Sequence, residues 1–390
     1  MEKRCFAGIK TPVSLLGFGL MRLPLLQTAG QQTASQASTG QPIDYATAEK
    51  MVDRALEAGV NYFDTAWTYH DGASEIFAGQ ALARHPREKY LLASKLPTWE
   101  IKSAEDVERI FAEQLKRCRV EFFDFYLVHS LNEDYYRIAL ETGVYELLLR
   151  KKEQGLIRHL GFSFHDHADL LERIVAGHGW DFAQIQLNYL DWEAQNAKRQ
   201  YEILERKNIP VIVMEPIRGG ALATLNPEAR KILSETAPEA SPASWALRYA
   251  ASLPGVLTVL SGMSTPEQLE DNLATFSNFE PVSDGERNLL YNAAAIFRRS
   301  GGIGCTGCAY CTPCPFKVDI PHIFSFYNHY SLSKNWYDFD NLYATLPAAA
   351  RAESCTSCGV CVPKCPQALA IPELIGKIAE FAKEGAEQNS

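Results

Sequence analysis

Five polar side chains that could carry out acid–base chemistry stand at or just after the ends of short apolar runs in this chain. Asp64, Lys95, His129 and Ser163 each end such a run, at intervals of 31, 34 and 34 residues, and Tyr69 follows Asp64 by five positions. An interval of this length holds one strand, one helix and two loops. Because the carboxyl ends of parallel strands meet at one edge of a sheet or barrel, we expect these side chains to converge there.

These residue types fit the reduction of a carbonyl group, whose oxygen needs a proton as hydride reaches its carbon. Tyr69 is the expected proton donor, but an unperturbed phenol, with a pKa of about 10, donates poorly at neutral pH. A neighbouring Lys95 ammonium would lower that pKa, Asp64 would keep the lysine charged, and His129 would orient the carbonyl or share the proton. Each residue alone also has a structural interpretation, as a loop cap, an ion pair, a core histidine or loop packing. Their joint occurrence at equivalent strand ends favours catalysis.

The elements that must position these residues alternate between apolar runs of strand length and helical patterns. After a hairpin over residues 4–14, we expect eight strands, at 15–19, 61–64, 91–95, 125–128, 157–164, 182–188, 210–215 and 256–261. Helical patterns occupy 45–58, 74–84, 103–118, 144–154, 168–175, 197–207 and 241–251. This alternation predicts an α/β fold, a (β/α)8 TIM barrel. An open Rossmann-type sheet is less favoured, because no Gly-x-Gly-x-x-Gly follows any strand.

Composition restricts the class of protein. With 390 residues, 46% of them apolar, the chain can bury a large core and form two domains. The net charge of −9, with no basic stripe, argues against nucleic acid or an anionic membrane surface as a partner. No signal peptide or membrane-spanning run is found, so we expect a cytoplasmic protein. Residues 27–41, rich in Gln, Ser, Thr, Ala and Gly, are predicted to form a surface loop or lid.

At this point the sequence resembles the aldo-keto reductase family. The resemblance lies in Ala58 to Ala66 with Tyr69, Ser94-Lys95, Val128-His129, Gly161-Phe162-Ser163 and Gln186 to Tyr189, in family order. It implies a catalytic tetrad of Asp64, Tyr69, Lys95 and His129, with Tyr69 as proton donor. It also implies a nicotinamide cofactor, NAD or NADP, whose amide is held by Ser163 and Gln186, with Asn188 near them.

Two departures from the family pattern concern the cofactor. Met214 stands where many members stack a tyrosine on the nicotinamide ring. A helix begins near Thr265, after the eighth strand, where barrels commonly bind phosphate. The segment 261–272 lacks the basic residues that usually bind the NADP phosphate, so the choice between NAD and NADP stays open. Arg218 could compensate or could be a solvated surface residue. The further candidate cofactor contacts in this segment are Ser264, Gln268 and Asn272.

Eight of the ten cysteines form two blocks, which read Cys305-x2-Cys308-x2-Cys311-x2-Cys314-Pro and Cys355-x2-Cys358-x2-Cys361-x3-Cys365-Pro. Clustered cysteines in a long chain point to metal. The blocks resemble two-cluster bacterial ferredoxins. By that resemblance one 4Fe–4S cluster is held by Cys305, Cys308, Cys311 and Cys365, and the other by Cys355, Cys358, Cys361 and Cys314. Paired zinc sites are the alternative, although a third and fourth cysteine in step favour iron–sulfur clusters.

A glycine-rich stretch from Ser300 to Gly304 predicts a boundary between a barrel over 1–299 and a ferredoxin-like domain, with a C-terminal helix, over 300–390. The connection between the cysteine blocks is rich in aromatic residues, which we expect to pack against the barrel: Phe324, Phe326, Tyr327, Tyr330, Trp336, Tyr337, Phe339 and Tyr343. The whole chain is predicted to be an oxidoreductase that reduces a carbonyl or oxidises an alcohol.

The iron–sulfur clusters of this predicted oxidoreductase would relay electrons to or from a partner such as ferredoxin or flavodoxin. A flavin could split electron pairs into single electrons, but no motif for one is found. Two alternatives stay open. One is a nicotinamide-only reductase with structural or sensing clusters, and the other is a non-catalytic electron carrier. No loop has a composition that selects a substrate.

Overall fold

The computed structural model describes residues 1–6, 8–26 and 41–389, and it divides into two compact units. The first unit contains the described residues up to Ile217, together with 243–288. The second contains 218–242 and the described residues from Leu289 onward, including all eight clustered cysteines. The unit that holds the cysteines is therefore built from two separate stretches of chain. The loop predicted over 27–41 lies, except for Gln41, outside the described residues.

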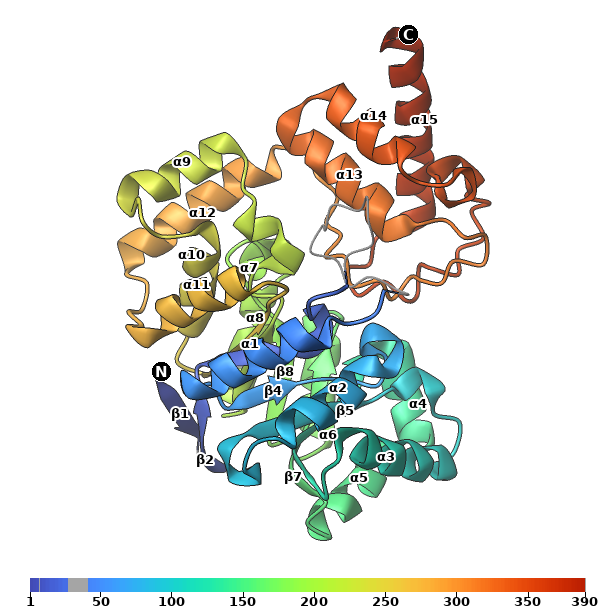
Figure 1. Ribbon diagram of the computed structural model, residues 1–390. Coiled ribbons are helices and arrows are strands. Elements are labelled where there is room, and N and C mark those ends of the chain that lie inside the picture. Colours follow the sequence, from blue (N-terminus) through green and yellow to red (C-terminus); the bar gives the residue numbers. More distant parts are fainter. Residues whose placement is uncertain (7, 27–40, 390) are drawn as a thin grey trace. The chain divides into compact units, whose positions relative to one another are not determined.

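The first unit is a closed barrel of parallel strands (Figure 1). The strands are β3 (Leu16–Gly19), β4 (Tyr62–Asp64), β5 (Leu91–Leu96), β6 (Phe123–Leu131), β7 (Ile157–Phe164), β8 (Phe182–Gln186), β9 (Val211–Met214) and β10 (Val256–Gly262). They close in sequence order, with β10 pairing both β9 and β3. Every residue of β4, β5 and β6 is buried, as expected for strands with side chains packed on both faces. The predicted (β/α)8 barrel is confirmed.

The seven predicted helical patterns of the barrel all correspond to helices. The helices associated with the barrel are α1 (Tyr45–Glu57), α2 (Ala73–Leu82), α3 (Ala104–Cys118), α4 (Glu133–Glu141), α5 (Val144–Glu153), α6 (Ala168–Gly177), α7 (Asp191–Ala194), α8 (Ala197–Arg206), α10 (Pro242–Ala251) and α11 (Pro266–Ser277). The predicted start of α11 is confirmed, because the Thr265 side chain accepts from the Gln268 N–H. Ser103 occupies the N-cap of α3 but makes no side-chain capping bond there.

The predicted hairpin precedes the barrel as β1 (Lys3–Phe6) and β2 (Ile9–Ser14), paired antiparallel. Ile9 and Val13 of β2 are fully buried in one apolar cluster with residues near the starts of the barrel strands, among them Tyr62 and Leu91. The residues between them are exposed. The hairpin therefore supplies one apolar face to the amino end of the barrel.

We expect Ile9→Ala to lower the free energy of unfolding of the barrel by about 2–5 kcal/mol, because it leaves a cavity among well-packed side chains. Urea-induced unfolding followed by tryptophan fluorescence measures this change. Lys10→Ala, one residue along and exposed, is the matched control and should change stability by less than about 0.5 kcal/mol. Equal unfolding midpoints for the two variants would contradict the role of the hairpin.

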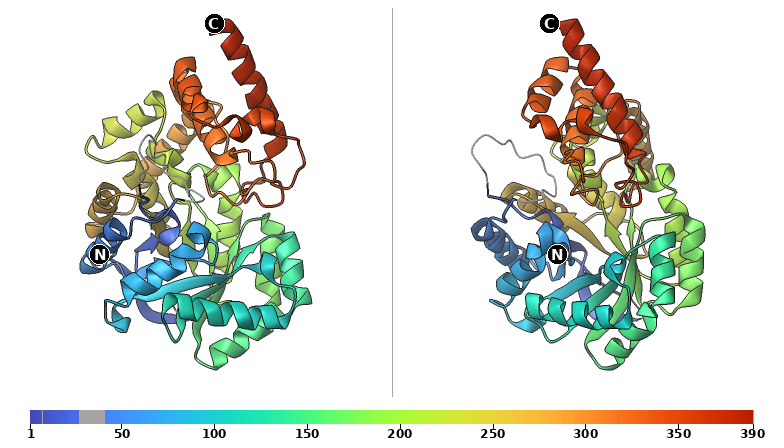
Figure 2. Two further views of the ribbon diagram at one scale, coloured as in Figure 1. Left: turned by 45° about the vertical axis from the view of Figure 1, so that its right-hand side comes forward. Right: turned by 90° about the vertical axis from the view of Figure 1, so that its right-hand side faces the viewer.

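The second unit is organised around three helices, α13 (Ile320–Ser333), α14 (Trp336–Ala344) and α15 (Ile371–Asn389), which pack together in both views of Figure 2. It also contains α9 (Pro227–Thr236) and most of α12 (Asp284–Arg298). Asn226, which caps α9, donates to the Ser300 hydroxyl at 2.7 Å, and Lys334 donates to the Ser300 carbonyl at 3.0 Å.

Most of the aromatic residues between the cysteine blocks pack in the core of this second unit. Four rings lie around Phe381 of α15, with centroids 4.7–5.5 Å from its own: Tyr327, Tyr330, Trp336 and Phe339. The sequence-based prediction that these aromatics pack against the barrel is therefore corrected. The physical reason is that cysteine loops contain few large apolar residues, so the helices must supply the core. Of the helices in the described part of the chain, none is both long enough and apolar enough for a membrane crossing.

Candidate active site and cluster ligands

Three of the four predicted catalytic residues meet at one buried ammonium group. Asp64 ends β4 and Lys95 lies on the neighbouring strand β5. The Lys95 Nζ donates to Asp64 Oδ1 at 2.5 Å, to the Thr65 carbonyl at 2.8 Å and to Tyr69 Oη at 3.3 Å. Lys95 is 0% exposed, Asp64 2% and Tyr69 8%. The phenol, the ammonium and the carboxylate are thus joined in one water-poor site.

Tyr69 is held by a turn with unusual backbone conformation. The three residues after it, His70, Asp71 and Gly72, have φ angles of 51°, 54° and 91°. Left-handed residues other than glycine cost free energy and persist only where their surroundings fix them. Here the Leu23 N–H donates to His70 Nε2 at 3.2 Å, and the Tyr69 N–H donates to the Ala66 carbonyl. The turn therefore gives the phenol a defined position beside Lys95.

His129 lies on β6 with its ring at right angles to that of Tyr69, the two centroids being 6.2 Å apart. The Trp99 ring packs against it at 5.1 Å. Burial, and then the nearby Lys95 charge, place the pKa of His129 well below its usual value. The imidazole is therefore neutral at physiological pH and can serve as a hydrogen-bond donor to a polar ligand atom.

Burial acts on the Asp64–Lys95 pair in opposite directions. It raises the pKa of Asp64 and lowers the pKa of Lys95, and each charge opposes the shift of the other. A salt bridge of 2.5 Å between fully buried groups keeps both ionised, since either charge alone would be unsolvated.

A second buried carboxylate, which the sequence analysis missed, lies on the other side of β5. Glu75 of α2 is 0% exposed and accepts from the Ser94 hydroxyl and the Gln114 amide, each at 2.6 Å. Gln114 also donates to the Lys95 carbonyl at 3.0 Å. This network fixes the backbone that carries Lys95. The signal that could have revealed it is an acid in line with the small and apolar residues Ala78, Gly79 and Leu82, three, four and seven positions along the helix.

The predicted nicotinamide contacts lie at the carboxyl ends of β7 and β8. Ser163 is 1% exposed, and its hydroxyl accepts from the Ser130 N–H at 2.7 Å. Gln186 and Asn188 both donate to Asp191 Oδ2 at 2.7 Å, and Asn188 Oδ1 accepts from the Asp191 N–H. Asp191, which sequence reasoning did not select, therefore orients both amides. Their contacts with a cofactor stay predictions.

The remaining cofactor candidates of the barrel hold its carboxyl-end loops in place. The Gln184 amide donates to Met214 Sδ at 3.6 Å, and Asn272 donates to the Ser261 hydroxyl at 2.8 Å. The Ser264 hydroxyl donates to the Arg22 carbonyl, and Gln268 Oε1 accepts from the Ser264 N–H. Arg22 forms an ion pair with Glu215 at 3.4 Å in the same region. The sequence analysis did not select Arg22.

Arg218, the last of the cofactor candidates, belongs to the unit that contains the cysteines. Its guanidinium Nη2 lies 3.5 Å from the carbonyl oxygen of Gly304, the residue before Cys305. Its predicted contact with a cofactor stays untested, and its observed neighbour is the first cysteine block.

The thiols that lie near Cys311 differ from those that lie near Cys361. Burial raises the pKa of the Cys311 thiol, and the neighbouring thiols that add to this effect are Cys308, Cys305 and Cys365. Burial likewise raises the pKa of Cys361, where the contributing thiols are Cys355, Cys358 and Cys314. These neighbours agree with the ligation that the resemblance to two-cluster ferredoxins implies, and the two ligand sets stay a prediction.

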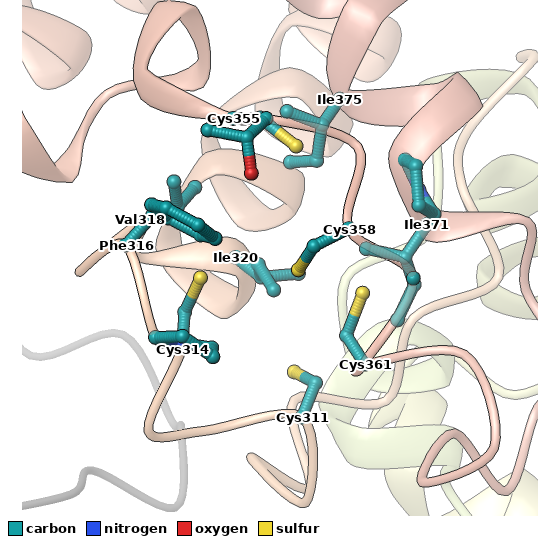
Figure 3. A pocket seen from close by; sticks show the side chains of 14 residues that line it. Cys311, Cys314, Phe316, Val318, Ile320, Cys355, Cys358, Cys361, Ile371 and Ile375 are labelled. Carbon is teal, nitrogen blue, oxygen red and sulfur yellow. The ribbon is translucent and has the colours of Figure 1, made fainter.

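Figure 3 shows five of these sulfurs around one cavity, whose apolar wall includes Val318, Ile320, Ile371 and Ile375. Half-buried thiols that disfavour one another's ionisation suit a cationic metal centre, which offsets their charges. Among the described residues, no three His, Cys, Asp or Glu side chains converge as ligands of a single ion. A 4Fe–4S cluster spreads its thiolates over four irons, so its ligands lie farther apart. The donor set fits such clusters.

Two family models match adjacent parts of the chain. Residues 16–290 match the model described as "Aldo/keto reductase family", and residues 304–371 match "4Fe-4S dicluster domain". The first match covers the whole closed barrel and all four catalytic candidates. The second begins just before Cys305 and includes all eight clustered cysteines.

Relatives and solved structures agree with the first match. The NADH-specific methylglyoxal reductase of Escherichia coli is 26% identical over 294 residues, covering 64% of this chain and 88% of that protein. The L-galactose dehydrogenase of Arabidopsis thaliana is 25% identical over 313 residues, covering 74% and 92%. An aldo-keto reductase from Bacillus halodurans, solved in its holo form, superposes with a TM-score of 0.61 at 23% identity, over 75% of this chain and 96% of that chain. This last likeness concerns the fold.

We expect Asp64→Asn to destabilise the barrel by about 3–5 kcal/mol, because it leaves the Lys95 ammonium buried without a counter-ion. The double variant Asp64→Asn with Lys95→Met removes both charges and should be more stable than the single variant. Equilibrium unfolding of the single, double and wild-type chains measures the difference. A double variant less stable than Asp64→Asn alone would contradict the buried ion pair.

Cys308→Ser should lower the iron bound per chain and the visible absorbance, because it removes one of the four thiolates of a cluster. Iron analysis and absorption spectroscopy of anaerobically purified protein measure both quantities. Cys5→Ser is the control, since Cys5 is exposed and lies in the barrel unit. Unchanged iron content in Cys308→Ser would refute the ligand assignment.

Proposed function

Because the chain belongs to the aldo-keto reductase family and continues into a 4Fe–4S dicluster domain, we propose that it interconverts a carbonyl and an alcohol with a nicotinamide cofactor while its clusters exchange electrons with a redox partner. The observation that carries this proposal is the contact of one buried Lys95 ammonium with both Asp64 and Tyr69. Ferredoxin or flavodoxin is the proposed kind of partner. The proposed location is the cytoplasm.

A bound nicotinamide would supply or accept the hydride. Tyr69 would donate its phenolic proton to the carbonyl oxygen as negative charge develops there. The Lys95 ammonium, 3.3 Å from the phenol oxygen, stabilises the phenolate that remains, and Asp64 keeps the ammonium in place. In the alcohol-oxidising direction the same phenolate would accept the proton.

His129 would donate a hydrogen bond to the substrate oxygen, which its neutral state allows without repelling Lys95. Ser163 and Gln186, at the carboxyl ends of adjacent strands, are the proposed holders of the nicotinamide amide. Asp191 fixes the orientation of the Gln186 amide by accepting from its Nε2. These roles divide the site into a proton-transfer side on β4 to β6 and a cofactor side on β7 and β8.

The clusters add a one-electron function to this two-electron site. A hydride carries two electrons and each cluster accepts one, so electron relay between the nicotinamide and the clusters would need a carrier, such as a flavin, that splits the pair. The name of the Escherichia coli relative specifies NADH and methylglyoxal. NADH and small dicarbonyl compounds are therefore the first cofactor and substrates to test.

Anaerobic addition of NADH or NADPH to the purified chain, with and without added flavin, tests the connection between barrel and clusters. Reduction of the clusters, seen as bleaching and as an EPR signal, would support electron relay. Clusters that dithionite reduces but neither nucleotide does, with or without flavin and substrate, would contradict relay. They would then serve a structural or sensing role.

Tyr69→Phe should lower kcat for carbonyl reduction by about 10²–10⁴-fold, because a general acid contributes about that factor. Nicotinamide binding, followed by fluorescence titration, should stay nearly unchanged, because the phenol is not a proposed cofactor contact. Tyr45→Phe on α1 is the control and should keep full activity. Retained turnover in Tyr69→Phe would exclude Tyr69 as the proton donor.

A further inference from the structure

The short segment Arg218–Gly219 contacts the residues on either side of Cys305. On one side, the Arg218 Nη2 lies 3.5 Å from the Gly304 carbonyl oxygen, and a Cβ placed on Gly304 would come within 2.9 Å of that nitrogen. On the other side, a Cβ placed on Gly219 would lie 2.2 Å from the Thr306 carbonyl oxygen. The segment therefore packs directly on the backbone that presents Cys305.

The backbone of this segment is held in a conformation that few residues adopt. Arg218, Gly219 and Gly220 have φ angles of 48°, 63° and 96°. A left-handed arginine costs free energy of order 1–3 kcal/mol and persists only where surrounding contacts fix it. The contacts with Gly304 and Thr306 are such a restraint. Thr306 itself is only 3% exposed, so the restraint lies in a packed part of the unit.

The charge that this segment carries lies at the start of the first cysteine block. The expected ligation places Cys305 in the first set, together with Cys308, Cys311 and Cys365. The guanidinium lies against the peptide unit next to Cys305 and carries a permanent positive charge. Reduction adds negative charge to a cluster, and a nearby cation in a partly buried site stabilises that reduced state.

We propose that Arg218 and Gly219 clamp the Cys305 loop, and that the Arg218 charge raises the midpoint potential of the cluster held by Cys305, Cys308, Cys311 and Cys365. Arg218 acts here as a positioning and electrostatic residue and not as a ligand. The proposal rests on the cluster ligands of the proposed function and is independent of hydride transfer. It selects one of the two clusters, because the contacts lie at Cys305.

Redox titration of the purified chain, followed by EPR, tests the electrostatic part. In Arg218→Gln one cluster should show a lower midpoint potential while the other is unchanged, and Arg218→Lys should restore most of the difference. Lys334→Gln is the matched control. It removes a cation that is also bonded to a backbone carbonyl, that of Ser300, five residues before Cys305, and it should change neither potential.

Gly219→Ala tests the clamp. Its methyl group would meet the Thr306 backbone, so we expect loss of the cluster that contains Cys305, with iron per chain falling toward that of a single cluster. Gly301→Ala is the matched control, because Gly301 is also left-handed, with φ 79°, but a Cβ there has no atom within 4 Å. Gly301→Ala should therefore keep both clusters.

Unchanged potentials and full iron content in Arg218→Gln would overturn the electrostatic part, and full iron content in Gly219→Ala would overturn the clamp. If Arg218→Gln loses a cluster, loss of one cluster supports the clamp, whereas loss of both overturns the assignment to Cys305. Wild-type protein without any cluster signal would refute the proposed function itself, and this is seen before any variant is made.

Discussion

The buried ion pair between Lys95 and Asp64 is the interaction on which the arrangement of the barrel site depends. An ammonium that is 0% exposed is tolerated only where a carboxylate and further acceptors surround it. Adjacent strands of a closed barrel meet this requirement, because they bring two side chains and the Thr65 carbonyl to one point on rigid backbone. The Tyr69 phenol oxygen lies 3.3 Å from the same ammonium nitrogen. The strained turn after Tyr69 and the Glu75 network behind Lys95 both serve to keep that point fixed.

The barrel and the tetrad could be predicted because their signals are local. Apolar runs that end in a polar residue mark the carboxyl ends of buried strands, and the eight runs correspond to β3 through β10. Glu75 and Arg22 were missed because their partners are distant in sequence, whereas Asp191 contacts Gln186 and Asn188 only a few residues away. The sequence around Glu75 does not indicate that the Gln114 amide will donate a hydrogen bond to it. Short helices such as α4 and α7, of nine and four residues, were missed because so few turns give little periodicity.

In the cysteine region, too, the candidate ligands could be predicted from the sequence, whereas the residues that pack around them could not. The resemblance to two-cluster ferredoxins implied two sets of four thiols, and the thiols that raise the pKa of Cys311 and of Cys361 agree with those sets. The prediction for the aromatic connection was wrong, because hydrophobic content shows that a residue is buried but not against which partner. Phe381 packs against four of those rings, and it is distant in sequence from the first of them, Tyr327. The contacts of Arg218 and Gly219 with Gly304 and Thr306 could not be predicted either, because in the sequence Arg218 and Gly219 belong to a loop of the barrel.

The two-stretch construction of the second unit sets an order for its assembly during protein synthesis. Residues 218–242 leave the ribosome before β10, and β10 before any of the clustered cysteines. Domains form largely in the order in which they are made. The barrel can therefore close while the segment that will bracket Cys305 is already attached to it and still lacks its counterpart. A unit made of both stretches can therefore be completed only after the later stretch has been synthesised, when every strand of the barrel is already available.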